Sequence, residues 1–184
     1  MKYIVLIFIA MATAMSITTD PLVYDFGEGK IFGRWTIIND DVMGGLSDAN
    51  ARVNKNSVFL NGYVSLKNNG GFVSLRGPVG KYDLSKYSLC EIRYKATNDR
   101  IFEVLLERET PFYLPKFRAK FASTKDDWET IIIPLKDFEI SRMGNTVQEG
   151  IDVNELKIIQ RIGFILSDKK EGDFTLEIDY LKFY

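Results

Sequence analysis

Residues Val58–Leu66 read VFLNGYVSL, and their pattern recurs along the whole chain. Apolar side chains occupy alternate positions at Val58, Leu60, Val64 and Leu66. Because successive side chains of a β-strand point to opposite faces, this alternation predicts a strand with one buried face and one solvent-facing face. We therefore expect a half-buried strand in this region.

The same period of two returns in residues 102–107, 117–121 and 174–180. Two other segments, 131–133 and 162–166, are continuously apolar, which is typical of central strands covered on both faces. Clusters of Gly, Pro, Asn and Asp between the segments predict turns, and the best helical signal is a turn or two over residues 153–159, with Asp152 as its expected N-cap. About ten short antiparallel strands in one domain predict an all-β sandwich or barrel.

The first residues predict an exported protein. An apolar run over residues 3–11 is followed at residues 12–14 by Ala-Thr-Ala, which has the A-x-A form of a signal-peptide cleavage site. No arginine precedes Arg34, so the Arg-rich composition of a mitochondrial import peptide is missing. We therefore interpret residues 1–14 as a signal peptide and residues 15–184 as a single domain that is periplasmic or secreted and soluble after cleavage. A retained membrane anchor is the alternative.

Composition excludes several classes of site. The chain has no histidine, which removes Ser-His-Asp and Cys-His activation and His-ligated zinc. Its formal net charge is −1 and it has no basic stripe, so no nucleic-acid partner is expected. The single cysteine, Cys90, permits no intramolecular disulfide, and its alternation with Ile92 and Tyr94 predicts a small core residue.

The most unusual segment is an acidic loop with a double glycine that follows a predicted strand. Its candidate ligand- or partner-binding residues are Asn39, Asp40, Asp41, Gly44, Gly45 and Ser47. Several side-chain oxygens close together are what a hard cation such as calcium requires, although the spacing is not that of an EF-hand. The alternative is a structural turn, in which Gly44 and Gly45 supply positive φ and Asp40 accepts hydrogen bonds from backbone N–H groups. The sequence leaves a metal site open.

Aromatic residues between positions 112 and 128 raise a carbohydrate-binding alternative. Tyr113 lies between two prolines and is expected in an exposed loop, whereas Phe117 and Phe121 share a strand face and are expected to be buried. A carboxylate-based hydrolase would need acidic side chains that face each other across a cleft. The neighbours Asp40 and Asp41 make a poor pair for that purpose.

Several motifs together resemble the complex I intermediate-associated protein 30 family. They are Trp35 with NDDVMGGLS at 39–47, FLNG at 59–62, NGGF at 69–72, WETIIIPL at 128–135, RIGF at 161–164 and GDFTLEID at 172–179. The resemblance implies a galactose-binding-like jelly roll, which is an antiparallel β-sandwich. The best-known members are mitochondrial chaperone-like factors that help assemble respiratory complex I and are not known as enzymes. The apparent export signal departs from that pattern and suggests a different partner.

These observations lead us to expect a non-enzymatic binding or assembly module without a cofactor. It would hold a protein partner or an envelope component through the loop Asn39–Ser47 and the neighbouring loop ends. A carbohydrate-binding accessory protein is the first alternative, which an exposed row of aromatic rings would favour, and a hydrolase is the second. A cation shared by Asp25 and Asp179, on the predicted first and last strands, is a further hypothesis.

Overall fold

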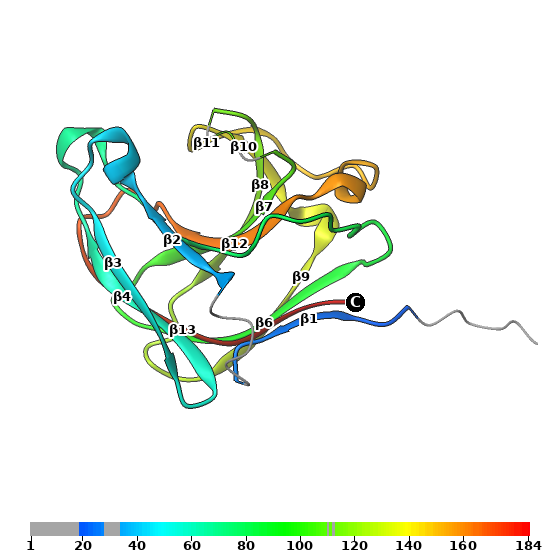
Figure 1. Cartoon of the computed structure of the whole chain (residues 1–184), viewed down its shortest axis with the longest axis horizontal. Helices are drawn as coiled ribbons and strands as arrows, with labels where there is room; N and C mark the ends of the chain where they lie inside the picture. The colour runs from blue at the N-terminus through cyan, green and yellow to red at the C-terminus, as the bar shows by residue number, and fades with distance from the viewer. Residues whose placement is uncertain (1–18, 28–33, 110, 112) are drawn as a thin grey trace, which may run out of the picture.

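The computed structural model describes residues 19–27, 34–109, 111 and 113–184. Within them the chain forms two antiparallel sheets packed face to face (Figure 1). The six-stranded sheet has the order β3-β4-β13-β6-β9, with β1 paired to β13. Its strands are β1 (Leu22–Asp25), β3 (Asp48–Asn54), β4 (Ser57–Val64), β6 (Leu89–Ala96), β9 (Glu129–Pro134) and β13 (Gly172–Phe183).

The seven-stranded sheet has the order β11-β10-β8-β7-β12-β5-β2. Its strands are β2 (Thr36–Asn39), β5 (Val73–Arg76), β7 (Ile101–Glu107), β8 (Lys116–Ala122), β10 (Glu139–Arg142), β11 (Asn145–Gln148) and β12 (Arg161–Leu166). Short 3-10 helices join some of the strands: η2 (Asp40–Met43), η3 (Lys67–Asn69), η4 (Leu135–Asp137) and η5 (Glu155–Ile158). The predicted all-β sandwich is confirmed.

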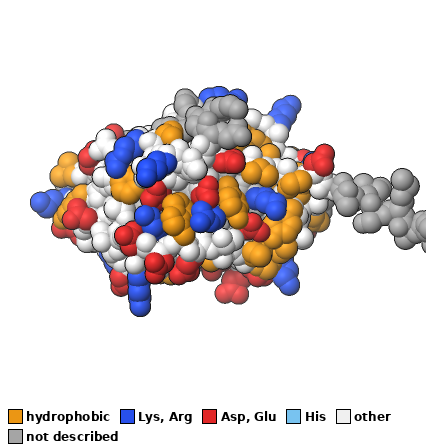
Figure 2. All heavy atoms as spheres, turned by 90° about the horizontal axis from the view of Figure 1, so that it is seen from below, with side chains coloured by type: hydrophobic (Ala, Val, Ile, Leu, Met, Phe, Trp, Pro, Cys, Tyr) orange, Lys and Arg blue, Asp and Glu red, His pale blue; other side chains and the backbone are white. Residues whose placement is uncertain are grey.

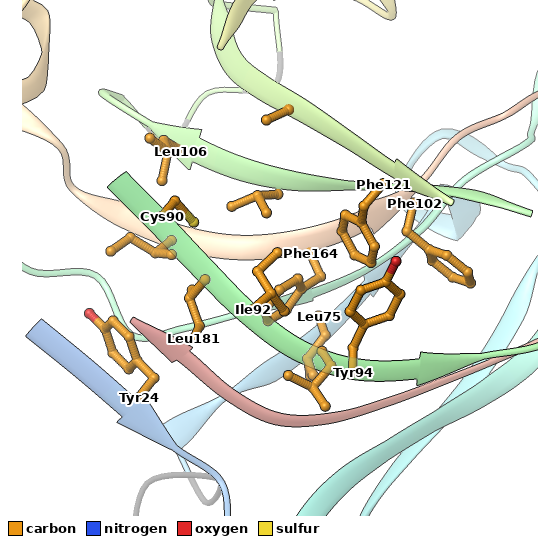
Figure 3. Close-up of a cluster of buried hydrophobic side chains, with 14 of the residues drawn as sticks. Tyr24, Leu75, Cys90, Ile92, Tyr94, Phe102, Leu106, Phe121, Phe164 and Leu181 are labelled. Atoms are coloured by element: carbon orange, nitrogen blue, oxygen red, sulfur yellow. The ribbon is translucent and has the colours of Figure 1, made fainter. Parts of the chain in front are cut away.

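The core lies between the two sheets and is rich in aromatic rings (Figure 3). Tyr94 of the six-stranded sheet meets Phe121 of the other sheet edge to face, with ring centroids 4.7 Å apart. Phe121 stacks on Phe102 at 5.8 Å, and Trp35 stacks on Phe164 at 6.0 Å. Such ring pairs contribute about 0.5–1.5 kcal/mol each beyond the burial of their apolar area. The interior therefore fixes how the sheets sit against each other.

The alternation in residues 58–66 is confirmed for strand β4. Val58, Leu60 and Val64 are buried, whereas Tyr63 between them is exposed. The strand ends at Val64, and Leu66 lies beyond it with 42% of its surface exposed. The pattern therefore placed the strand correctly and extended it by two residues too many.

Strand β9 corrects the interpretation of residues 131–133 as a central strand. It pairs only with β6 and forms an edge of the six-stranded sheet, and Ile132 is 54% exposed. Residues 162–166, by contrast, lie in the buried strand β12 between β7 and β5, as predicted. A run of β-branched residues favours any strand, so it does not distinguish an edge strand from a central one.

Strand β13 holds the six-stranded sheet together. Along one side it pairs first with β4, over Gly172–Ile178, and then with β1, over Tyr180–Phe183, and along the other side it pairs with β6. Its register with β6 shifts between Ile178 and Tyr180, which marks a bulge. Because three strands from distant parts of the sequence meet it, β13 makes mostly long-range contacts.

Short helical structure appears where the sequence indicated it, over Glu155–Ile158. The expected N-cap, Asp152, lies two residues before the actual N-cap, Asn154. The Asp152 carboxylate instead accepts a hydrogen bond from the Asn154 backbone N–H at 2.7 Å, closing a local turn.

Cys90 lies fully buried in β6, as predicted. Burial, with a smaller effect from the neighbouring Glu91, raises the pKa of its thiol far above the usual value. Since the thiolate is the reactive form, we expect Cys90 not to react with 5,5′-dithiobis(2-nitrobenzoate) in the folded protein and to react completely once guanidinium chloride unfolds it. Absorbance of the released thionitrobenzoate measures this, and rapid reaction of the native protein would contradict the buried position.

The outer face of the six-stranded sheet carries intermingled acidic, basic and apolar side chains (Figure 2). Lys95 pairs with Glu177 at 3.2 Å and Arg93 pairs with Asp179, while the Arg93 guanidinium lies 4.7 Å from the ring centroid of Trp128. Opposite charges therefore neutralise one another across this face. No helix within the described residues is long and apolar enough to cross a membrane. The predicted signal peptide, residues 1–14, lies outside the described residues.

Candidate functional site

The acidic loop is built around a buried carboxylate. Strand β2 ends at Asn39, and the next residue, Asp40, is completely buried. The Asp40 carboxylate accepts hydrogen bonds from the backbone N–H and the hydroxyl of Ser47, at 2.9 and 2.5 Å, and from the backbone N–H groups of Gly71 and Phe72, at 2.6 and 3.2 Å. One side chain thus joins the loop after β2 to the loop before β5. We call these four residues the Asp40 cluster.

This carboxylate explains one glycine of each double glycine, Gly45 in the first pair and Gly70 in the second. A Cβ atom on Gly45 would lie 2.3 Å from Asp40 Cγ, and one on Gly70 would lie 2.6 Å from Asp40 Oδ2, so neither position has room for a side chain. Gly44 adopts a φ of +85°, the positive value expected from the sequence. Gly45 does not share that conformation, and its role is to let the backbone approach Asp40 closely.

Asp40 stays ionised although it is buried. Burial alone would raise the pKa of Asp40, but hydrogen bonds from Ser47, Gly71 and Phe72 outweigh it and hold the pKa below its usual value. The carboxylate is thus occupied by donors of the protein itself. No group of three or more His, Cys, Asp or Glu side chains among the described residues is arranged to hold a metal ion.

The Asp40 cluster holds several large apolar side chains at the surface. Val42, Met43 and Leu46 are 66%, 48% and 57% exposed, and all belong to the loop that Asp40 anchors. Leu66 belongs to the second anchored loop, which also contacts the first through a hydrogen bond from Asn68 Nδ2 to the Gly44 carbonyl at 3.1 Å. The two loops lie together at one end of the sandwich (Figure 1). We call Val42, Met43, Leu46 and Leu66 the apolar tip.

The remaining candidate residues from the sequence occupy different surroundings. Asn39 is half-buried, and its Oδ1 atom has no hydrogen-bond partner among the described residues. Asp41 is exposed and accepts a hydrogen bond from the Val42 backbone N–H at 3.0 Å. Tyr113 is 50% exposed, as expected, but it lies in the loop between β7 and β8 and does not join the acidic loop. The structure therefore brings Asp40, Gly45 and Ser47 together and leaves Tyr113 apart.

A cation shared by Asp25 and Asp179 finds little support in their surroundings. The two residues lie on the paired strands β1 and β13, but Asp25 accepts a hydrogen bond from the Gly27 backbone N–H at 2.8 Å. Asp179 is paired with Arg93. Each carboxylate therefore has a partner within the protein.

A charged cluster that the sequence pattern did not predict lies on the outer face of the seven-stranded sheet. Glu107, on β7, is fully buried and pairs with Arg76 at 3.0 Å, with Lys116 at 3.2 Å and with Arg161. Burial lowers the pKa of Arg76 and that of Lys116, and the nearby cations act in the same direction. Three cations therefore surround one carboxylate in a nearly dry environment, which we call the Glu107 cluster. Alternation along 102–107 had predicted a solvent-facing side here, and the ion pairs bury it instead.

Comparison with solved structures agrees with the predicted jelly roll. The family 11 carbohydrate-binding module of a cellulosomal cellulase of Clostridium thermocellum superposes with a TM-score of 0.64, covering 90% of this chain and 95% of the module at 17% identity. The family 11 module from the same organism in complex with a β-1,3-1,4-mixed-linked tetrasaccharide gives 0.61, covering 89% and 94% at 17% identity. At this identity the likeness establishes the β-sandwich fold alone.

A curated sequence relative corrects the expected localisation. The mouse (Mus musculus) protein "Complex I intermediate-associated protein 30, mitochondrial" is 28% identical over 181 residues, covering 87% of this chain and 55% of its own length. The chain therefore spans about half the length of this relative. The relative's mitochondrial location contradicts our expectation of an exported protein, which rested on the apolar run and A-x-A site of residues 1–14 and on the absence of arginine before Arg34.

The family itself is established by a match along most of the described chain. The family described as Complex I intermediate-associated protein 30 matches residues 24–178, from strand β1 into strand β13. This range includes the Asp40 cluster, the apolar tip and the Glu107 cluster. The chain therefore belongs to the complex I intermediate-associated protein 30 family.

Proposed function

We propose that this protein is a non-enzymatic, chaperone-like assembly module of mitochondria that holds a subunit of a respiratory complex I intermediate through its apolar tip. Family membership and the name of the mouse relative support the class of function and the class of partner. The exposure of Val42, Met43 and Leu46 on a loop fixed by Asp40 is the observation that carries the choice of site.

The apolar tip exposes large apolar side chains on loops that Asp40 anchors. Large apolar side chains that cluster at the surface commonly mark interaction sites, because the free energy falls when a partner covers them and water is released. Hydrogen bonds to a buried carboxylate keep the loop in one conformation, so little conformational entropy is lost when a partner binds. Four side chains that protrude from a rigid end suit a shallow apolar groove on another protein.

The structure gives less support to the two alternatives. Among the described residues, the exposed aromatic side chains Tyr63, Tyr113 and Trp128 lie on separate elements and form no row for stacking on sugar rings. Glu103 and Glu107 lie on one strand, and both are held in ion pairs with basic side chains. They therefore do not face each other across a cleft as a glycoside hydrolase requires.

The proposal is tested by replacing the exposed loop residues together, as Val42→Ser/Met43→Ser/Leu46→Ser. Immobilised parent and variant proteins are incubated with mitochondrial extract from the source organism, and bound complex I subunits are quantified by mass spectrometry. We expect the variant to retain its stability within about 0.5 kcal/mol, because these side chains are solvent-exposed. We also expect it to recover roughly fivefold less of the complex I subunits, since exposed apolar anchors dominate such interfaces.

The matched control is Val153→Ser/Ile158→Ser, which removes two apolar side chains that are 52% and 53% exposed near η5. This control should recover complex I subunits as well as the parent does. Equal losses in both variants, or recovery of no complex I subunit by the parent, would refute the proposal.

A further inference from the structure

A cavity of about 320 Å³ opens on the outer face of the seven-stranded sheet, at the end of β7 that begins with Ile101. Most of the residues that line it are polar or charged, although they contribute much of their apolar stems to its wall: Glu103, Arg118, Lys120, Ser167, Asp168 and Lys169. Ile101 adds an apolar wall. We call this cavity the basic pocket, because its basic side chains are less completely paired than its acidic ones.

The carboxylates in the pocket already have partners. Glu103 accepts hydrogen bonds from Arg118 at 3.0 Å and from Ser167 at 3.1 Å. Asp168 is held by Arg100 through two hydrogen bonds of 2.9 Å each. Neither acidic group therefore remains to neutralise a further cation.

The basic side chains are not all satisfied. Lys169 forms no ion pair with any described residue, and the Nε atom of Arg118 is buried without a hydrogen-bond acceptor in the same part of the chain. Lys120 is more than half exposed and reaches Glu139 only at 3.5 Å. The Arg118 Nε atom is too deeply buried for a ligand to reach, whereas the exposed ammonium groups of Lys120 and Lys169 are accessible to an added acceptor.

The excess of positive charge continues along the same strands. The pocket and its flanks hold four cations and three carboxylates, and the Glu107 cluster, on β5, β7, β8 and β12, adds three cations and one carboxylate. This face is therefore positive on a chain whose formal net charge is −1. Such a local field attracts an anion.

The basic pocket and the apolar tip share one turn of the chain. Residues 167–169 line the pocket, and two residues further on Glu171 accepts hydrogen bonds from the Leu66 backbone N–H at 3.1 Å and from the Tyr63 hydroxyl at 3.2 Å. Leu66 belongs to the apolar tip. A single partner that covers the tip can therefore reach the pocket.

We propose that the basic pocket binds an acidic side chain, Glu or Asp, of the same protein partner that covers the apolar tip. This inference rests on the proposed function and specifies the second half of its interface. A carboxylate fits better than a phosphate group, because three carboxylates beside the pocket leave room for about one added negative charge. The methylene groups of a Glu side chain would pack on Ile101, and the carboxylate would accept hydrogen bonds from Lys120 and Lys169.

The probe is an acetylated and amidated tetraglutamate peptide with a fluorescent label, and its binding to the full chain is measured by anisotropy at low ionic strength. We expect the peptide to bind and the Lys120→Gln/Lys169→Gln variant to bind it about fivefold more weakly, the effect of losing partly exposed charge pairs. The matched control is Lys86→Gln/Lys136→Gln, which removes two cations outside the pocket and should stay within about twofold of the parent. A tetraglutamine peptide should not bind to any of them.

Three outcomes would overturn the inference: no binding of tetraglutamate to the parent, equal weakening by the control variant, or displacement of the peptide by inorganic phosphate at a lower concentration than by acetate. The experiment also separates this inference from the proposed function. The variant Val42→Ser/Met43→Ser/Leu46→Ser should bind tetraglutamate like the parent while recovering fewer complex I subunits. Unchanged tetraglutamate binding together with unchanged recovery would refute the function and leave the pocket intact.

Discussion

Replacing Glu107 with Gln should destabilise the protein by about 3–5 kcal/mol, the usual cost of removing one partner from a buried ion pair. The substitution leaves Arg76, Lys116 and Arg161 close together without a counter-charge, although their side chains are only 10%, 7% and 11% exposed. Urea unfolding followed by tryptophan fluorescence measures the change in the free energy of unfolding. The slope of the transition should stay the same, because the surface exposed on unfolding does not change.

A second substitution shows whether repulsion among the three cations causes the loss of stability in Glu107→Gln. In Glu107→Gln/Lys116→Met one cation is removed together with the carboxylate, so repulsion within the cluster falls and part of the lost stability should return. Lys116→Met alone leaves Glu107 with two cations and should cost less than Glu107→Gln. If the loss in the free energy of unfolding of the double variant equals the sum of the losses of the two single variants, the three cations do not interact as the structure indicates.

Replacing Asp40 with Asn should have the next largest effect, a loss of about 2–4 kcal/mol. The amide has the shape of the carboxylate, but an NH₂ group replaces one of the two acceptor oxygens. In either orientation this NH₂ group would face hydrogen-bond donors that bond to oxygen in the parent protein, either at Ser47 or at Gly71 and Phe72. Thermal and urea unfolding both report the change. Asp41→Asn is the matched control, because Asp41 is exposed and bonds only to its neighbour Val42. The control should change stability by less than about 0.5 kcal/mol.

The pH dependence of the Asp40 variant follows from the lowered pKa of this carboxyl. A carboxylate whose pKa is lower in the folded state stabilises the protein above the unfolded pKa of about 3.9, and this contribution disappears as the pH falls through the folded value. The stability difference between parent and Asp40→Asn should therefore be constant near neutral pH and shrink in acid below about pH 4. A difference that is unchanged down to about pH 2 would show that folding does not lower the pKa of this carboxyl, and a difference that grows in acid would show that folding raises it.

The parts of the fold that local pattern controls were accessible from the sequence. The alternation of Val58 and Leu60 with half-buried neighbours fixes which face of β4 enters the core, because a strand has only two faces. Phe117 and Phe121 are likewise buried together, as their spacing predicts. The jelly-roll order of the strands came from the family resemblance, since pairing between distant strands leaves no local signal.

The parts that depend on tertiary neighbours were not accessible in the same way. Glu107 has the spacing of a solvent-facing residue, and only the approach of Arg76 from β5, Lys116 from β8 and Arg161 from β12 buries it. Gly45 appeared as a residue of a turn, whereas its close contact with Asp40 is visible only once the loop has folded back. The apolar tip gave no periodic signal, because its side chains lie on irregular backbone.

The position of β13 in the sequence also constrains when the six-stranded sheet can form during translation. Its partners β1, β4 and β6 all precede it, so during synthesis they leave the ribosome before the strand that joins them. Their unpaired edges must then be kept apart until residues 172–183 emerge. We therefore expect nascent chains stalled before Gly172 to be digested by protease throughout the six-stranded sheet, and resistance to appear in one step once β13 is complete. The timing of translation, and not only the composition of the core, thus determines when this sandwich first becomes stable.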